Sequence, residues 1–260
     1  MRTAYYRILL YIDSCTEHDV YYETAVHMLD HLDKVPTTSI QEIAALCYVS
    51  PSTISRFCRK VSFESYNDFK QKVVESLDYF ERDFEYYFPN EKSEDNVLEN
   101  HRQLIEASIE EAHKLIKVED VQKLVHLIHS KKRIIFLGNY FTQNSALQLQ
   151  MELAHFKKET YALYNWNAQL EMVKTATKDD LLIITSMTGQ FLDYANEIMR
   201  QFKHSKASKV VISSGQLPDY LNDLDLYIQI SKEKDMGNKF SILYLYELIE
   251  LIYHFTYFKS

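Results

Sequence analysis

The sequence predicts two domains, an all-helical bundle followed by a three-layer α/β domain with a five-stranded parallel sheet. Apolar residues recur at helical spacing through residues 1–86, whereas from residue 119 helical stretches alternate with short, strongly apolar runs. That alternation is typical of a parallel sheet with helices on both faces. A polar, proline-containing segment separates the two patterns, and all four glycines follow it. We therefore expect a helical domain at 1–86, a linker at 87–96 and an α/β domain at 97–260.

Residues 39–61 are expected to form two short helices joined by a tight corner. Ser39 and Glu42 have the spacing of a capping box. Ser50 can cap the second helix, and Pro51 suits its first position, where no backbone N–H bond is lost. Each helix has one apolar face at the spacing i, i+3, i+4, i+7, formed by Ile40, Ile43, Ala44 and Cys47 and by Ile54, Phe57, Cys58 and Val61.

The second of these helices has a polar, cationic face without an acidic residue. Its members are Ser50, Ser52, Thr53, Ser55, Arg56, Arg59 and Lys60. A helix-turn-helix motif presents such a face to the major groove of DNA. The planar fork of Arg56 matches the two acceptors of guanine, while Arg59 and Lys60 are better placed for phosphates. The pattern predicts binding to a double-stranded DNA operator. The alternative is a solvated helix face in an ordinary bundle, which the two matched caps and apolar faces disfavour.

These residues resemble the N-terminal domain of RpiR-type transcriptional regulators over roughly residues 18–78. The similar segments are Ser-Ile-x-Glu-Ile-Ala from Ser39 and Val-Ser-Pro-x-Thr-Ile-x-Arg-Phe-x-Arg-Lys from Val49. One departure is Tyr48, where the family usually has glycine. A glycine at a corner normally allows a positive φ, which is costly for a bulky residue. We therefore expect a slightly reshaped corner.

Charge and composition limit the possible environments of the chain. The net charge is −8, but residues 51–72 hold five basic residues against two acidic ones, so an acidic body with one basic patch is expected.

No apolar run reaches the roughly 18 residues that span a bilayer. The N-terminal apolar stretch ends at Asp13 without a signal-peptide cleavage pattern, so a first helix is expected there. Cys15, Cys47 and Cys58 lack metal-ligand spacing and suit a reducing compartment. We expect a cytoplasmic protein with no metal, cofactor or membrane partner.

Five strands are expected in the α/β domain, at 133–137, 161–164, 181–185, 209–212 and 225–230. Helices are expected at 96–117, 143–157, 166–176, 190–204 and 239–258, with a short link at 216–224. Gly138, Gly189 and Gly215 follow the first, third and fourth strands. Ligands of open α/β sheets bind beyond the carboxyl ends of the strands, where glycine allows the backbone to approach them.

The third strand leads into a hydroxyl-rich turn, Ser186-Met-Thr-Gly-Gln190. Hydroxyls and backbone N–H groups of such a turn can hold a phosphate without a cationic side chain. The turn resembles the Ser-x-Ser/Thr-Gly phosphate turn of the sugar isomerase (SIS) domain, which RpiR-type regulators carry after their DNA-binding domain. This resemblance implies a sugar-phosphate effector and a homodimer or higher homo-oligomer. The candidate ligand residues are Thr142, Ser186, Thr188, Gly189, Gln190, Ser213 and Ser214.

The turn after the first strand departs from the SIS pattern Gly-x-Gly-x-Ser. Tyr140 replaces the second glycine and Thr142 replaces the serine. A tyrosine ring there can fill the space of a sugar, which leaves open a ligand-free domain that serves only as a dimerisation scaffold.

A phosphosugar isomerase is the alternative from another functional class. Aldose–ketose isomerisation needs a positioned base, for which Glu152, His155 and Glu171 are available, although none lies in a distinctive motif. We therefore expect no catalytic residue. The favoured function is a transcriptional regulator of carbohydrate metabolism that binds DNA and a phosphorylated sugar.

Overall fold

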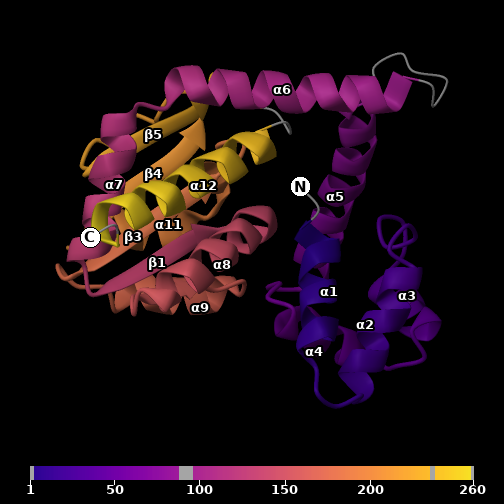
Figure 1. Ribbon diagram of the computed structural model, residues 1–260. Helices are drawn as coiled ribbons and strands as arrows, with labels where there is room; N and C mark the ends of the chain where they lie inside the picture. The colour runs from indigo at the N-terminus through magenta and orange to yellow at the C-terminus, as the bar shows by residue number, and fades with distance from the viewer. Residues whose placement is uncertain (1–2, 88–95, 235–237, 259–260) are drawn as a thin grey trace. The chain divides into compact units, whose positions relative to one another are not determined.

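The computed structural model describes residues 3–87, 96–234 and 238–258 (Figure 1). The chain forms two units, Met1–Lys92 and Ser93–Ser260, each with a core of its own. The linker predicted at 87–96 lies, apart from its two end residues, outside the described residues.

The N-terminal unit consists of helices around one apolar core. These are α1 (Thr3–Ser14), α2 (Val20–Asp30), α3 (Ile40–Leu46), α4 (Pro51–Lys60) and α5 (Tyr66–Tyr87). The first helix expected from the sequence is therefore present as α1. The apolar faces predicted for α3 and α4 meet in this core, where Ile43, Ile54 and Phe57 are fully buried. Among the described helices of the whole chain, none has both the length and the apolar character required to cross a membrane.

Both predicted helix caps of the α3–α4 pair are present. The hydroxyl of Ser39 accepts a hydrogen bond from the Glu42 amide at 3.3 Å, and the Glu42 carboxylate accepts one from the Ser39 amide at 2.7 Å. This reciprocal pair lowers the pKa of Glu42, mainly through the hydrogen bond from the Ser39 backbone. At α4, the Ser50 hydroxyl accepts from the Thr53 amide at 3.2 Å, and Pro51 occupies the first helical turn.

The corner between α3 and α4 is strained at Tyr48. Its φ of 57° lies in the left-handed region, which a family-typical glycine would adopt without strain. This conformation costs a residue with a Cβ on the order of 1 kcal/mol. The backbone of the corner is tight, because the amides of Tyr48 and Val49 donate to the carbonyls of Ala45 and Ala44 at 3.2 and 2.9 Å.

Replacing Ser39 with alanine should destabilise the N-terminal unit by about 1 kcal/mol, because the Glu42 amide loses its acceptor. The expected result is a lower urea midpoint in circular dichroism at 222 nm. The fluorescence of Trp166, the only tryptophan and a residue of the C-terminal unit, provides an internal control that should not shift. Ser14→Ala is the matched variant, since the Ser14 hydroxyl only donates to the Tyr11 carbonyl at the end of α1. Equal midpoints for the two variants would contradict the capping role.

The C-terminal unit has a five-stranded, all-parallel sheet in the order β2-β1-β3-β4-β5. The strands are β1 (Arg133–Gly138), β2 (Glu159–Ala162), β3 (Asp180–Ser186), β4 (Ser208–Ser214) and β5 (Leu226–Ser231). The helices are α6 (Val97–Leu115), α7 (Val118–Ser130), α8 (Tyr140–His155), α9 (Trp166–Lys174), α10 (Gln190–Tyr194), α11 (Asn196–His204) and α12 (Asn238–Tyr257). The fold class is as predicted. Several bounds differ: β2 is shifted by two residues toward the N-terminus, α8 begins three residues earlier than expected, and the helix expected at 190–204 is interrupted at Ala195.

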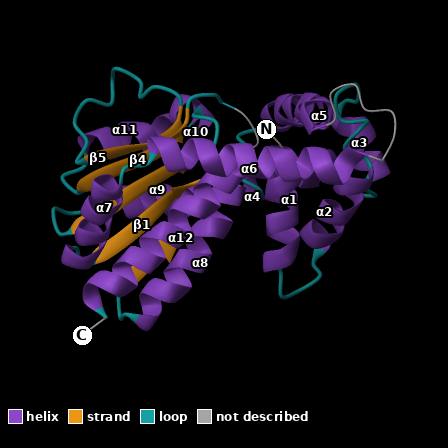
Figure 2. Ribbon diagram, turned by 45° about the horizontal axis from the view of Figure 1, so that its top comes forward, coloured by secondary structure: helices purple, strands orange, loops and turns teal. Residues whose placement is uncertain are grey.

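Helices cover both faces of the sheet and form a three-layer unit (Figure 2). Because side chains alternate along a strand, Phe136 packs with α7, α8 and α12, whereas Leu137 packs with α9, α10 and α11. The strand order reverses direction between β1 and β3, which are neighbours although β2 lies between them in sequence. Such a reversal creates a crevice at the carboxyl ends of the two strands, where doubly wound sheets bind ligands.

Helix α6 is fixed to the carboxyl end of β5. The Glu111 carboxylate accepts hydrogen bonds from the Ser231 hydroxyl at 2.8 Å and from the Lys232 amide at 3.1 Å. The same helix meets α12, where the Ser241 hydroxyl donates to the Ser108 carbonyl at 3.1 Å. The helix that follows the predicted linker is therefore part of the α/β unit.

Candidate nucleic-acid interface and ligand site

The polar face of α4 is accessible on the N-terminal unit. Ile54, Phe57 and Cys58 are buried. The seven residues predicted to contact DNA lie outside that core: Ser50, Ser52, Arg56, Arg59 and Lys60 are exposed, and Thr53 and Ser55 are half-buried. The structure therefore places all seven predicted residues on or beside one side of a single helix.

The hydroxyls at the start of α4 form a connected group. Ser50 Oγ lies 2.7 Å from Ser52 Oγ and 2.9 Å from Thr53 Oγ1. The same Ser50 oxygen caps the helix, so its first role is structural. Ser52 and Thr53 are held beside it, in the part of a reading helix that usually approaches base edges.

The three cations of α4 differ in how they are held. Arg59 donates to the Ser55 hydroxyl at 3.2 Å. The ammonium of Lys60 lies 4.9 Å from the ring centre of Tyr21 and 5.9 Å from that of Tyr11, which are cation–π distances. Arg56 makes no hydrogen bond or ion pair with any residue that the structure describes. Its donors are therefore available to an outside acceptor.

The basic patch is smaller than a count of charges predicts. Lys70 donates to the Thr38 carbonyl at 3.0 Å, and Lys72 forms an ion pair with Glu75 at 2.7 Å. Both lysines are thus engaged within the unit. The cationic surface consists mainly of Arg56, Arg59 and Lys60.

At the carboxyl edge of the sheet, the turn after β3 brings several predicted ligand residues together. The Ser186 hydroxyl accepts a hydrogen bond from the Phe191 amide at 3.2 Å, and the Ser213 hydroxyl donates to the Ser186 carbonyl at 3.0 Å. Gly189 has a φ of 77° and directly precedes α10. Thr188 is half-buried and Gln190 is exposed. Helix α10 has only five residues, so the long helix expected to face a phosphate is absent at this turn.

A cation that the sequence analysis missed lies over this turn. A Cβ atom added to Gly189 would lie 3.3 Å from both Cε and Nζ of Lys234, and one added to Gly215 would lie 3.2 Å from Cε. The Lys234 side chain therefore passes over both glycines, with its ammonium beside the Ser186–Gly189 turn. Hydroxyls and backbone N–H groups are sufficient for a phosphate in the sequence-based prediction, which does not include this lysine. The available signal was the lysine after the fifth strand, because the carboxyl ends of parallel strands meet at one edge.

The turn after β1 uses its polar groups for its own structure. Thr142 is buried and donates to the Asn139 carbonyl at 2.7 Å. It also occupies the space beside Gly138, since a Cβ there would lie 2.3 Å from Thr142 Oγ1. Tyr140 is 52% exposed rather than packed into the turn. Ser214 is buried, and its hydroxyl has no hydrogen-bond partner among the described residues. Thr142 is thus engaged in the fold, while the Ser214 hydroxyl is unsatisfied.

Comparison with known proteins finds a family match within the N-terminal unit. A model of the helix-turn-helix domain of the rpiR family matches residues 23–79. Residues 23–79 are an rpiR-family helix-turn-helix domain. The HTH-type transcriptional regulator HexR of Pseudomonas aeruginosa is 26% identical over 156 residues, which cover 58% of this chain and 53% of HexR. The match thus spans about half the length of that relative.

Two solved structures share the fold of this chain or of its C-terminal part. The NanR protein of Vibrio vulnificus, complexed with ManNAc-6P, superimposes with a TM-score of 0.54 and 14% identity, covering 98% of this chain and 92% of NanR. The sugar isomerase domain of an RpiR transcription factor from Sphaerobacter thermophilus gives a TM-score of 0.51 and 14% identity, covering 60% of this chain and 89% of that domain. The C-terminal unit has this SIS fold.

The candidate isomerase bases Glu152, His155 and Glu171 do not gather at the carboxyl edge of the sheet. Glu152 and His155 lie in the last turn of α8, which starts at the carboxyl edge and runs away from it. Glu171 is paired with Lys174 at 2.8 Å on α9. A base must reach the carbon that it deprotonates, and this arrangement offers no such base at Ser186.

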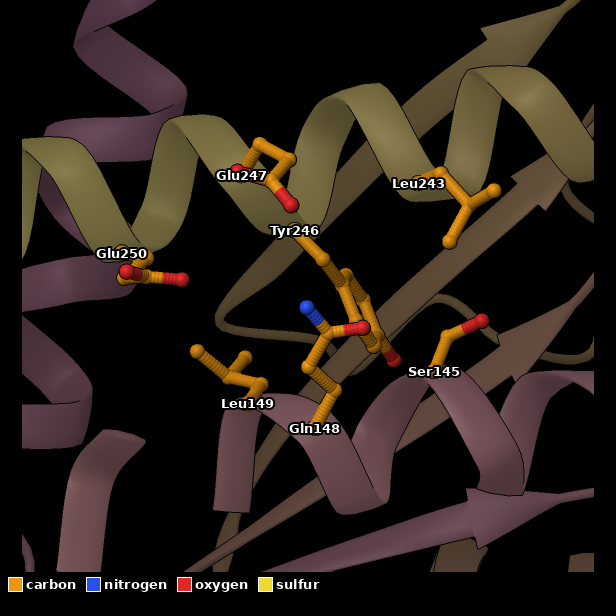
Figure 3. Close-up of a pocket in the computed structure, with 7 residues that line it drawn as sticks. All are labelled: Ser145, Gln148, Leu149, Leu243, Tyr246, Glu247 and Glu250. Atoms are coloured by element: carbon orange, nitrogen blue, oxygen red, sulfur yellow. The ribbon is translucent and has the colours of Figure 1, made fainter. Parts of the chain in front are cut away.

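A second polar cluster lies between α8 and α12 (Figure 3). The groove is lined by Ser145, Gln148, Leu149, Leu243, Tyr246, Glu247 and Glu250. The hydroxyls of Tyr246 and Thr185 share a hydrogen bond of 2.7 Å. Burial raises the pKa of the Tyr246 phenol. Burial, together with Glu152 and Glu247, raises the pKa of Glu250. The groove has about 10 Å³ of space, which is at most enough for one water molecule. It is therefore a crevice between packed helices and too small for a sugar phosphate.

Proposed function

We propose that this chain is a transcriptional regulator that binds DNA through α4 and a phosphorylated sugar through its SIS unit, and that it acts as a homodimer. The observation that carries the DNA-binding part is the exposed, acid-free face of α4 with an unengaged Arg56. Because two-fold symmetric operators are bound by dimers, the protein should be dimeric at micromolar concentration. A monomer in analytical ultracentrifugation would count against the proposal.

Selection from a random DNA library tests DNA binding and requires no known operator. Purified protein should enrich a related set of sequences with two half-sites about one helical turn apart, or a multiple of it. The enriched site then serves as the ligand for all later variants. Failure to enrich any sequence, together with no binding to unrelated DNA at low salt, would refute a DNA-binding regulator.

The ligand part rests on the convergence of Lys234, Ser186, Ser213 and Gly189 at one edge. A phosphate has several acceptor oxygens and a negative charge, which an ammonium, hydroxyls and backbone N–H groups can satisfy together. The sugar phosphate bound by NanR, a protein of the same fold, supports this class of effector. Regulation of carbohydrate metabolism follows from such an effector.

Sugar phosphates should raise the thermal midpoint of the protein, and the matching unphosphorylated sugars should not. At a hundredfold excess over Kd, binding to the native state alone stabilises by about 2.7 kcal/mol. Lys234→Met should remove most of this shift by weakening phosphate binding about tenfold or more. Lys232→Met is the matched control, because Lys232 lies two positions away and approaches Gly215 with its backbone carbonyl, at 3.8 Å from an added Cβ, rather than with its side chain. No shift with any sugar phosphate would favour a ligand-free dimerisation scaffold.

A further inference from the structure

Tyr48 combines backbone strain with almost complete exposure. It is 84% exposed and has a φ of 57°. The other described non-glycine residues with positive φ, Ser62 and Lys157, have polar side chains. A large aromatic side chain at such a position is costly, and Tyr48 does not offset this cost by packing into the core.

The position of Tyr48 is fixed relative to the start of α4. It lies two residues before Ser50, the cap of the helix, and four before Ser52, both of which are exposed. Its ring meets the His27 ring edge-on, with centroids 5.4 Å apart. The side chain therefore has one lateral support and is otherwise open to solvent.

We infer that Tyr48 is an additional DNA-contact residue, whose phenol donates a hydrogen bond to a backbone phosphate beside the groove that α4 enters. This inference rests on the proposed DNA-binding function. Phosphate oxygens flank the groove and accept hydrogen bonds from tyrosine hydroxyls. Such contacts carry no base preference, so Tyr48 contributes affinity and helps to orient the domain, while Arg56 discriminates between sequences.

The test uses full-length Tyr48→Gly and Tyr48→Phe on the library-selected site and on an unrelated duplex. Both variants should bind both duplexes about tenfold more weakly, since each loses one hydrogen bond to a charged group. Tyr48→Gly should also raise the thermal midpoint of the N-terminal unit by a few degrees, because glycine tolerates positive φ. If Tyr48→Gly is more stable than the wild type but binds DNA less well, then the tyrosine side chain serves DNA contact at a cost in stability.

Ser62→Gly is the matched control, because Ser62 has a φ of 65° beyond the other end of α4. It should raise the midpoint without changing affinity. Wild-type affinity in both Tyr48 variants would overturn the inference while leaving the proposed function intact. Loss of affinity in Tyr48→Gly alone would overturn the phenol–phosphate contact. A wild-type protein that binds no DNA would refute the inference together with the proposed function.

Discussion

Arg56→Ala should abolish most of the preference of the protein for its selected DNA site. The guanidinium is exposed on α4 and is not held by any described residue, so the variant should fold normally. A bidentate contact between arginine and guanine discriminates by about 1–3 kcal/mol, or roughly five- to 150-fold in affinity. The expected result is a large loss on the selected site and a small loss on unrelated DNA.

Fluorescence anisotropy over a range of salt concentrations separates base contacts from phosphate contacts. Arg59→Ala should weaken binding to both duplexes alike and reduce the salt slope by about one. Arg56→Lys keeps the charge but loses the planar fork, so it should restore affinity without restoring preference. If Arg56→Ala still distinguishes the two duplexes as the wild type does, then Arg56 does not contact bases.

Asp180→Asn should destabilise the C-terminal unit by about 3 kcal/mol. The carboxylate is buried at the start of β3 and accepts from Arg133 at 2.9 and 2.7 Å. It also accepts from the Thr177 amide and hydroxyl at 2.7 and 3.0 Å. Asparagine removes the charge and replaces one acceptor oxygen with a donor, so Arg133 and Thr177 lose acceptors that the fold provides.

Urea unfolding followed by Trp166 fluorescence measures this loss. Glu171→Gln is the control, because its ion pair with Lys174 is exposed and should contribute close to nothing. An equal urea midpoint for Asp180→Asn and Glu171→Gln would contradict the structural role of the Asp180–Arg133 pair.

The stability that Asp180 gives to the C-terminal unit should fall at acidic pH. The hydrogen bonds from Arg133, followed by those from Thr177, lower the pKa of Asp180 from 3.8 to about 2. A carboxyl with a lowered pKa in the folded state stabilises fully above its unfolded pKa. This contribution declines as the pH falls from about 4 through about 2, and Asp180→Asn should lack that component. Parallel acid-unfolding curves for the wild type and Asp180→Asn would rule out a lowered pKa at Asp180 as the source of this stability.

The sequence predicts well those elements whose signal is local. The capping box at Ser39 and the cap at Ser50 depend on neighbours within three residues. The central strands are continuous apolar runs, as expected for strands buried on both faces. The interruption at Ala195 has no glycine or proline signal. The burial of Phe191 and Ile198 on either side of it indicates that packing sets this break.

The missed parts of the sites depend on contacts between distant residues. Lys234 reaches Gly189 only because β5 ends beside β4, which no local pattern indicates. In the same way, Tyr11 and Tyr21 belong to α1 and α2 but hold the ammonium of Lys60 on α4. Charge counting likewise placed Lys70 on a basic surface, whereas its ammonium donates to the carbonyl of Thr38, 32 residues away. Residue type alone therefore predicted the sites only in part.

The hydrogen bonds of Glu111 determine where the SIS unit can be separated from the chain. A fragment that begins at α7, just before the sheet, would lose the acceptor of the Ser231 hydroxyl and the Lys232 amide. It would also uncover the surface of α12 around Ser241 that α6 covers. A protein preparation intended for ligand soaking or crystallisation of this half should therefore start at or before Val97, so that the segment leading to Lys234 keeps its anchor.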